Sequence, residues 1–96
     1  MIAIIAAVRV KTDRLADFER DFLLFAADVR ANESGNSLFQ LCGDPKRPGE
    51  YKIMELYDSE DALKAHSASA HAAHWSPVIV ALLDGAPEIQ KLNVIG

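Results

Sequence analysis

The first ten residues constrain the fold most, because they are apolar along both alternating rows of side chains. One row contains Ile2, Ile4, Ala6, Val8 and Val10, and the other contains Ala3, Ile5, Ala7 and Arg9. Successive side chains of a strand point to opposite faces, so residues 2–10 predict a strand that must be covered on both sides. The chain's own helices can cover one side, and we expect a second subunit to cover the other.

The chain has 96 residues, which predicts one domain spanning residues 1–96. A domain of this size buries only about 60% of its unfolded surface, and half of the residues here are apolar. A single cysteine excludes an internal disulfide, and no Cys/His group has the spacing of a structural zinc site. Oligomerisation is the simplest remaining source of stability, so we predict a homodimer.

The charge pattern narrows the range of partners and the location. The net charge is −4 and the basic residues are scattered, which argues against nucleic acid and against an anionic membrane surface. The apolar N-terminus lacks a basic region and is shorter than the ~20 residues of a membrane span. Cys42 lies in an apolar run and is predicted to be a reduced, buried thiol. We therefore expect a cytoplasmic protein.

A continuous apolar stripe predicts the first helix. Its members recur at helical spacing: Leu15, Phe18, Phe22, Phe25 and Val29. Thr12 is the expected N-cap, and Gly35 is the expected C′ residue that ends the helix.

The rest of the chain predicts three strands and a broken helix. Residues 37–42 and 51–57 read as an antiparallel hairpin, because the loop 43–49 between them is rich in turn residues. Ser59 is expected to cap a short helix and Ser69 to restart it, while Gly85 ends the second part. Pro77 either kinks that part or, with Ser76 as cap, begins its second half. Residues 88–95 predict a final strand.

The order of these elements, βαββαβ, predicts a ferredoxin-like α+β fold with a four-stranded antiparallel sheet. Its helices cover one face of the sheet and leave the other face open. Two such sheets packed through their open faces would cover the doubly apolar first strand. The predicted homodimer therefore forms through the open sheet face.

Glu55 is the first candidate for chemistry. Alternation places its carboxyl on the same face as Tyr51, Ile53 and Tyr57, where burial would raise its pKa and suit it to proton transfer. The alternative is a structural ion pair with Arg9 or with a partner subunit.

Histidines and aromatic rings supply the other candidates. His66 is expected on the inner face of the short helix, and His71 on the stripe of Trp75; either could accept a proton or be held structurally by the backbone. His71 and His74 have the spacing of a metal pair, but no acidic third ligand is obvious, so we predict no metal. Aromatic residues line either a pocket or a plain core: Phe22, Phe25, Phe39 and Trp75.

Taken together, the chain resembles the antibiotic biosynthesis monooxygenase (ABM) domain family, and within it the small quinol-monooxygenase-like proteins. The resemblance rests on Asn32-Glu33-x-Gly35, Phe39 where the family usually has Tyr, Asp44-Pro45, Glu55-x-Tyr57-x-Ser59-x-x-Ala62-Leu63 and Ala65-His66-x-x-Ser69-x-His71. It implies a dimeric α+β barrel with a pocket between the sheet and the helices of each subunit.

The resemblance also implies an activity, the oxidation of small quinols or phenols by molecular oxygen without metal, flavin or other cofactor. The partner would be a small aromatic or quinone-like molecule. His66 or His71 would accept the phenolic proton, with Glu55 as orienting partner. The walls of the substrate site would be Phe39, Tyr57, Trp75 and Phe22.

Other branches of the family define the alternatives. One is a non-catalytic dimer that binds a small ligand or serves in stress response. Another is an isomerase of the autoinducer-processing branch, whose phosphorylated substrate needs a basic site that the scattered cations here do not form. Haem-degrading members match poorly, because this chain has Ala6 and Ala7 where they have Asn, and His66 where they have Trp.

Overall fold

The structure is a computed structural model that describes all residues from 1 to 96. The elements, in chain order, are β1 (Ile2–Arg9), α1 (Leu15–Asn32), β2 (Asn36–Gly43), β3 (Glu50–Tyr57), α2 (Glu60–Ser67), α3 (Ala70–Val80) and β4 (Glu88–Asn93). None of the helices combines the length and the apolar composition that a membrane crossing needs.

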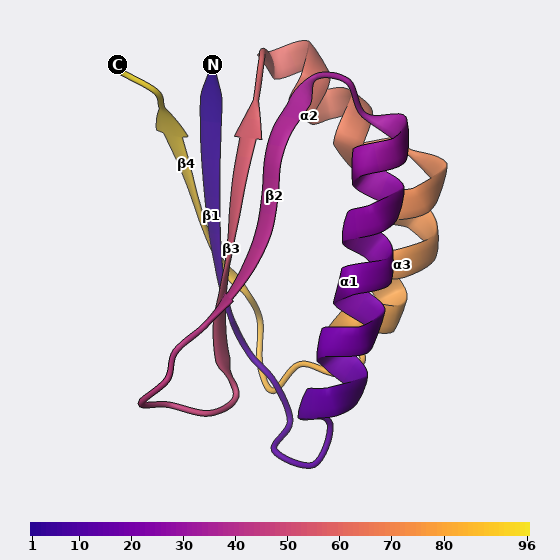
Figure 1. Cartoon of the computed structure of the whole chain (residues 1–96), viewed down its shortest axis with the longest axis vertical. Coiled ribbons are helices and arrows are strands. Elements are labelled where there is room, and N and C mark those ends of the chain that lie inside the picture. Colours follow the sequence, from indigo (N-terminus) through magenta and orange to yellow (C-terminus); the bar gives the residue numbers. More distant parts are fainter.

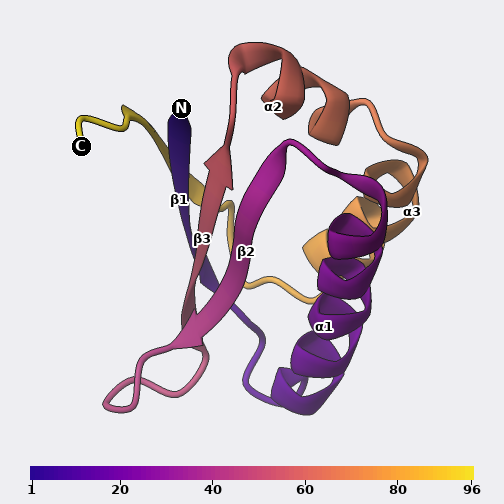
Figure 2. The same cartoon turned by 45° about the horizontal axis from the view of Figure 1, so that its top comes forward.

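The four strands form one antiparallel sheet in the order β2-β3-β1-β4. Both views show α1 and α3 on one face of this sheet, while the opposite face carries no helix (Figures 1 and 2). The short α2 lies beyond the end of β3 and leads into α3 (Figure 2). The predicted ferredoxin-like α+β fold is confirmed.

The core lies between the helices and one row of the sheet. The first row of β1 is buried as predicted, and so is the helical stripe that packs toward it, with Phe18, Phe22, Phe25 and Val29 all nearly inaccessible. Each buried ring or branched side chain contributes roughly 1.5–3 kcal/mol relative to exposure. The spacing of these residues therefore fixes which face of α1 meets the sheet.

The uncovered face of the sheet, which we call the open face, is crossed by a row of apolar side chains. Paired residues of neighbouring strands form this row: Leu38, Leu56, Ala3 and Leu92. Met54 adjoins it, and the side chains of Met54 and Leu92 are 42% and 45% exposed. Cys42 also lies on this face, exposed and opposite Lys52, because alternation along β2 turns it away from the helices. The prediction of a buried thiol is therefore wrong for this chain.

The expected ends of α1 are also corrected. The amide of Arg14 donates to the carbonyl of Lys11, so Thr12 lies inside a turn, and the helix begins later without a side-chain cap. At the other end Glu33 is the C-cap, with extended backbone. Gly35 has no positive φ; instead, a Cβ on this residue would lie 2.7 Å from Ala62 Cβ. Gly35 thus permits close approach of α2 rather than ending α1.

The later helices follow the sequence more closely. Ser59 and Ser69 cap α2 and α3 as predicted, each accepting an amide hydrogen three residues on. Pro77 lies inside α3, which runs through it, so Ser76 does not cap a separate half. Gly85 has φ of +102° but lies beyond the end of α3 at Val80, in the turn that leads toward β4.

Candidate active site

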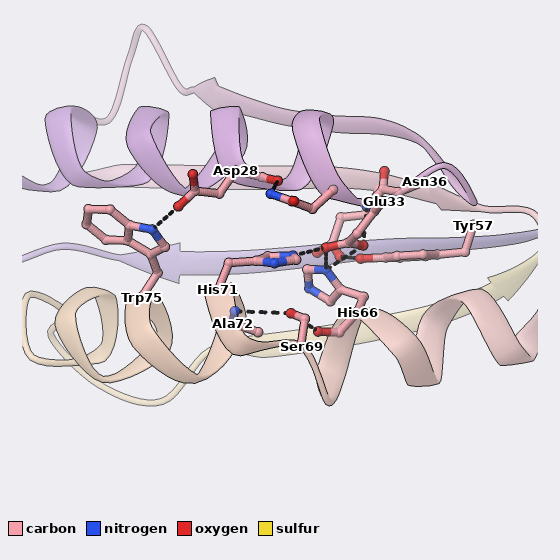
Figure 3. Close-up of polar contacts among 11 residues, drawn as sticks. Asp28, Glu33, Asn36, Tyr57, His66, Ser69, His71, Ala72 and Trp75 are labelled. Carbon is pink, nitrogen blue, oxygen red and sulfur yellow. Dashed lines mark hydrogen bonds and ion pairs between the residues drawn. The ribbon is translucent and has the colours of Figure 1, made fainter.

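Glu33, just beyond the end of α1, comes together with His66 of α2 and His71 of α3, and we call these three residues the Glu33 cluster. His66 Nδ1 lies 2.9 Å and 3.0 Å from the two carboxylate oxygens of Glu33. His71 Nε2 contacts Glu33 Oε2 as well, so one carboxylate lies between two imidazoles (Figure 3). The cluster sits at the end of the sheet where β3 meets α2.

Local structure accounts for this convergence. Glu33 is the C-cap of α1, and its extended backbone turns the chain toward β2. Ser69 separates the two histidines: its hydroxyl donates to the carbonyl oxygen of His66 at 2.7 Å and accepts from the amide of Ala72 at 3.1 Å. The turn between α2 and α3 is thereby fixed, so His66 and His71 face the same carboxylate.

Burial and hydrogen bonding define the electrostatics of the cluster. The side chain of Glu33 is 8% exposed, and those of His66 and His71 are each 13% exposed. Burial alone would raise the pKa of Glu33. Hydrogen bonds from His71 and His66, the charge of His66 and the amide of Asn36 outweigh it and hold the pKa below its ordinary value. Glu33 is therefore an ionised acceptor at neutral pH.

Asn36 joins the cluster from β2 and was missed by the sequence analysis. Its Nδ2 donates to Glu33 Oε1 at 3.4 Å, and it faces Tyr57 across the two strands. A β-bulge between Asn36 and Leu38 shifts the register, so Asn36 shares the helix-facing side with Phe39. Simple alternation places these two residues on opposite faces. The only nearby sequence feature that pointed to a site was the family-like run Asn32-Glu33-x-Gly35, which ends one residue before Asn36.

Glu55 lies on the helix-facing side of β3, as predicted, but its partner differs. Tyr57 Oη donates to Glu55 Oε1 at 2.5 Å, whereas Arg9 pairs with Glu50 at the other end of the strand. The alternative ion pair between Glu55 and Arg9 is therefore wrong. Burial raises the pKa of Glu55, and burial together with the charge of Glu55 raises the pKa of Tyr57. In the structure Glu33, not Glu55, contacts the histidines.

Aromatic rings form the inner wall of the cluster. His66 packs against Phe25, Phe39 and Tyr57, with ring centroids 6.0, 5.4 and 5.4 Å away. Phe22 stacks on Phe39 at 5.3 Å and is only 2% exposed, so it supports this wall from deeper in the core. Of the four rings predicted to form the wall, Phe39 and Tyr57 therefore pack against His66.

Trp75 and His74 are set apart from the cluster. The indole N–H of Trp75 donates to Asp28 Oδ2 at 2.7 Å (Figure 3). His74 packs edge-on against the Trp75 ring, and neither of its nitrogens belongs to the Glu33 cluster. The two imidazoles that come together are those of His66 and His71. The acidic group that the sequence left unidentified beside the histidines is Glu33.

A cavity of about 670 Å³ lies away from the Glu33 cluster. Its lining includes Arg9, Arg47 and Lys52 together with acidic residues, at the hairpin-loop end of the sheet. None of its lining residues belongs to the Glu33 cluster. The cluster instead meets solvent through the small exposed parts of its own side chains.

Fold and site together define a class: a small ferredoxin-like α+β protein with a carboxylate–imidazole cluster between the end of its sheet and its helices. Residues 1–77 match the model of the family described as antibiotic biosynthesis monooxygenase. The chain belongs to this family.

Solved structures agree with this assignment. A Caulobacter crescentus protein assigned to the antibiotic biosynthesis monooxygenases is 36% identical, with a TM-score of 0.95 over 99% of this chain and 90% of that one. A Nitrosomonas europaea protein with the same assignment is 21% identical, with a TM-score of 0.90 over the whole of both chains. The second likeness shows the fold alone. No protein of curated function matches the chain.

Proposed function

We propose that this chain is a monooxygenase that oxidises small quinols or phenols with molecular oxygen and without a cofactor. The observation that carries the proposal is the Glu33 cluster, in which a carboxylate holds two imidazoles beside an aromatic wall. Membership of the monooxygenase family supports the reaction class. The choice of a quinol as substrate goes beyond the reaction class and is part of our proposal.

The proposed reaction needs a proton acceptor more than any other group. Oxidation of a hydroquinone to a hydroxyquinone consumes one molecule of oxygen and releases one of water, so the substrate itself supplies all the electrons. Removal of its phenolic proton makes the ring electron-rich enough to reduce oxygen, and a C–O bond then forms at the ring. Loss of water from the resulting hydroperoxide gives the product.

The chain's residues have matching roles in this scheme. His66 or His71 accepts the phenolic proton through the nitrogen that does not face Glu33. The ionised Glu33 carboxylate stabilises the imidazolium that forms and fixes its ring. Glu55 and Tyr57 lie behind His66 as a hydrogen-bonded pair, and their role is to hold the aromatic wall in place.

Oxygen consumption with a panel of substituted hydroquinones tests the proposal. We expect uptake that survives a chelator and falls roughly 10²-fold in His66→Ala and His71→Ala, the usual contribution of a positioned base. His74→Ala is the matched control, because His74 shares α3 with His71 but lies outside the cluster. Absence of uptake across the panel, or wild-type rates in both cluster variants, would contradict it.

The second candidate is a dimer of the same fold that binds a small ligand without turnover. The position of the 670 Å³ cavity, away from the Glu33 cluster, favours this alternative. Substituted hydroquinones that bind, detected by fluorescence of Trp75, but cause no oxygen uptake would support it over the oxygenase.

We further propose that the chain forms a homodimer through its open face. The row from Leu38 to Leu92 crosses all four strands, and a single chain leaves it without a covering element. Packing two such rows together buries apolar area on both chains and closes the second side of β1. The pattern of apolar side chains on the open face supports this proposal.

A further inference from the structure

We propose that Glu33, His66 and His71 form a three-ligand site for a divalent ion of the zinc class. One oxygen or nitrogen of each residue lies within 4.8 Å of the corresponding atoms of the other two. The three donors come from the end of α1, from α2 and from the first turn of α3. They are therefore held by the tertiary fold rather than by one flexible segment.

The separation between the donors of His66 and Glu33 suits a shared ion. Zinc binds imidazole nitrogen and carboxylate oxygen at about 2.0–2.2 Å, so two donors at tetrahedral or right angles lie about 2.9–3.5 Å apart. His66 Nδ1 lies 2.9 Å and 3.0 Å from the Glu33 oxygens, and His71 Nε2 contacts the same carboxylate. The contact between His71 Nε2 and Glu33 is closer than two ligands of one ion allow, so binding requires a side-chain rotation that moves these two atoms apart.

The chemistry of the donors selects the class of ion. Two imidazoles and one carboxylate suit Zn²⁺, Co²⁺ or Fe²⁺, whereas Mg²⁺ and Ca²⁺ prefer sets made of oxygen alone. Three protein ligands leave at least one position open for water or for an anionic oxygen of a ligand. Asn36 Nδ2 donates to Glu33 Oε1, which is the kind of outer contact that orients a ligating carboxylate.

Binding of the ion can be measured without substrate, and therefore separately from the proposed oxygenase activity. Oxygen uptake and metal binding would use the same imidazoles, so each is measured under conditions that exclude the other. Oxygen uptake is measured with a chelator present, and metal binding is measured on chelator-treated protein with Zn²⁺ or Co²⁺ alone. If the protein fails to consume oxygen, the metal-binding measurement can still be interpreted, and the reverse also holds.

The decisive experiment is a calorimetric titration of the chelator-treated protein with Zn²⁺. We expect one ion per chain, with affinity at least about 100-fold weaker in Glu33→Gln, His66→Ala and His71→Ala. His74→Ala and Cys42→Ser are the controls, because they remove the nearest other imidazole and the exposed thiol. Both should bind like wild type.

Two further readouts keep the test independent of folding defects. Co²⁺ should give a d–d absorption spectrum in wild type that the cluster variants lack. Saturating Zn²⁺ should raise the unfolding temperature of wild type and His74→Ala but not of His71→Ala. Each variant is first melted without metal to establish that it is folded. Equal affinity in wild type and His71→Ala, or no stoichiometric binding to wild type, would overturn the proposal.

Discussion

The hydroxyl of Tyr57 donates to the carboxyl group of Glu55 at 2.5 Å, two residues earlier on the same face of β3. A carboxyl on the helix-facing side of a central strand loses most of its hydration. That loss raises the pKa of Glu55, and the hydrogen bond from Tyr57 and the charge of His66 offset it only in part. The folded state therefore favours the protonated form of Glu55 more than the unfolded state does.

This difference predicts how Glu55→Gln changes stability with pH. Because the folded pKa is raised, the stabilising contribution of Glu55 is complete below its unfolded pKa of about 4.3 and is lost as pH rises through the folded value. Gln keeps a neutral side chain of similar shape. We expect Glu55→Gln to match wild type in urea unfolding near pH 4 and to be more stable near pH 7.

The comparison is made as a difference between two proteins at each pH, which removes the titration of other groups. Glu88→Gln is the control, because Glu88 lies exposed on β4. Its difference from wild type should not change in the same way with pH. A Glu55→Gln protein that is less stable than wild type at neutral pH would contradict the assigned direction of the pKa shift.

Gly35→Ala should disturb the contact between the start of β2 and α2. The added methyl group would lie 2.7 Å from Ala62 Cβ, well inside van der Waals contact. Overpacking of this kind costs about 1–3 kcal/mol, which we expect as a loss in the free energy of unfolding from denaturant titration. Gly43→Ala is the matched control, since its methyl would meet only the Tyr51 ring at 3.6 Å.

A second substitution separates steric overlap from backbone effects. Ala62→Gly removes the opposing methyl group, at a cost of about 1 kcal/mol for glycine in a helix. If overlap is the cause, Gly35→Ala combined with Ala62→Gly should be more stable than the sum of the two single effects predicts. Strict additivity would point to the backbone of residue 35 instead.

Ser69→Ala should weaken the turn that positions both histidines. Ser69 caps α3 through the amide of Ala72 and also bonds the carbonyl of His66, so its loss should cost about 1 kcal/mol in unfolding free energy. Ser67→Ala, at an exposed position in the last turn of α2, should leave stability within a few tenths of a kcal/mol of wild type. Equal stabilities of the two variants would show that the cap does not hold this turn.

The sequence was sufficient for the fold because its signals there are local and repeated. Alternation along residues 2–10, the helical stripe from Leu15 to Val29 and the serine caps each depend on near neighbours. The helix ends at Thr12 and Gly35 were mispredicted because residues common at helix ends also serve other purposes. Thr12 lies in a turn, and Gly35 makes room for Ala62.

The site was only partly predictable, because its central contacts join residues far apart in the sequence. His66 and His71 were identified from their residue type and helical position. Glu33 was not assigned to them, since it precedes His66 by 33 positions and only the tertiary fold, which places α2 and α3 beside the end of α1, brings them together. Asn36 was hidden for a different reason: the β-bulge reverses the alternation that would have placed it.

Leu92→Arg should convert the proposed dimer into a monomer, whereas Leu24→Arg should not. The two leucines are similarly exposed in the single chain, at 45% and 49%, but Leu92 belongs to the apolar row of the open face and Leu24 lies on α1. A guanidinium group packed against the partner's open face would lose its hydration without an acidic partner, and association would weaken strongly. Sedimentation equilibrium over a range of concentrations measures the effect, with wild type expected at twice the 10.5 kDa mass of the chain. A monomeric wild type, or a dimer that tolerates Leu92→Arg but dissociates with Leu24→Arg, would place the contact elsewhere than the open face.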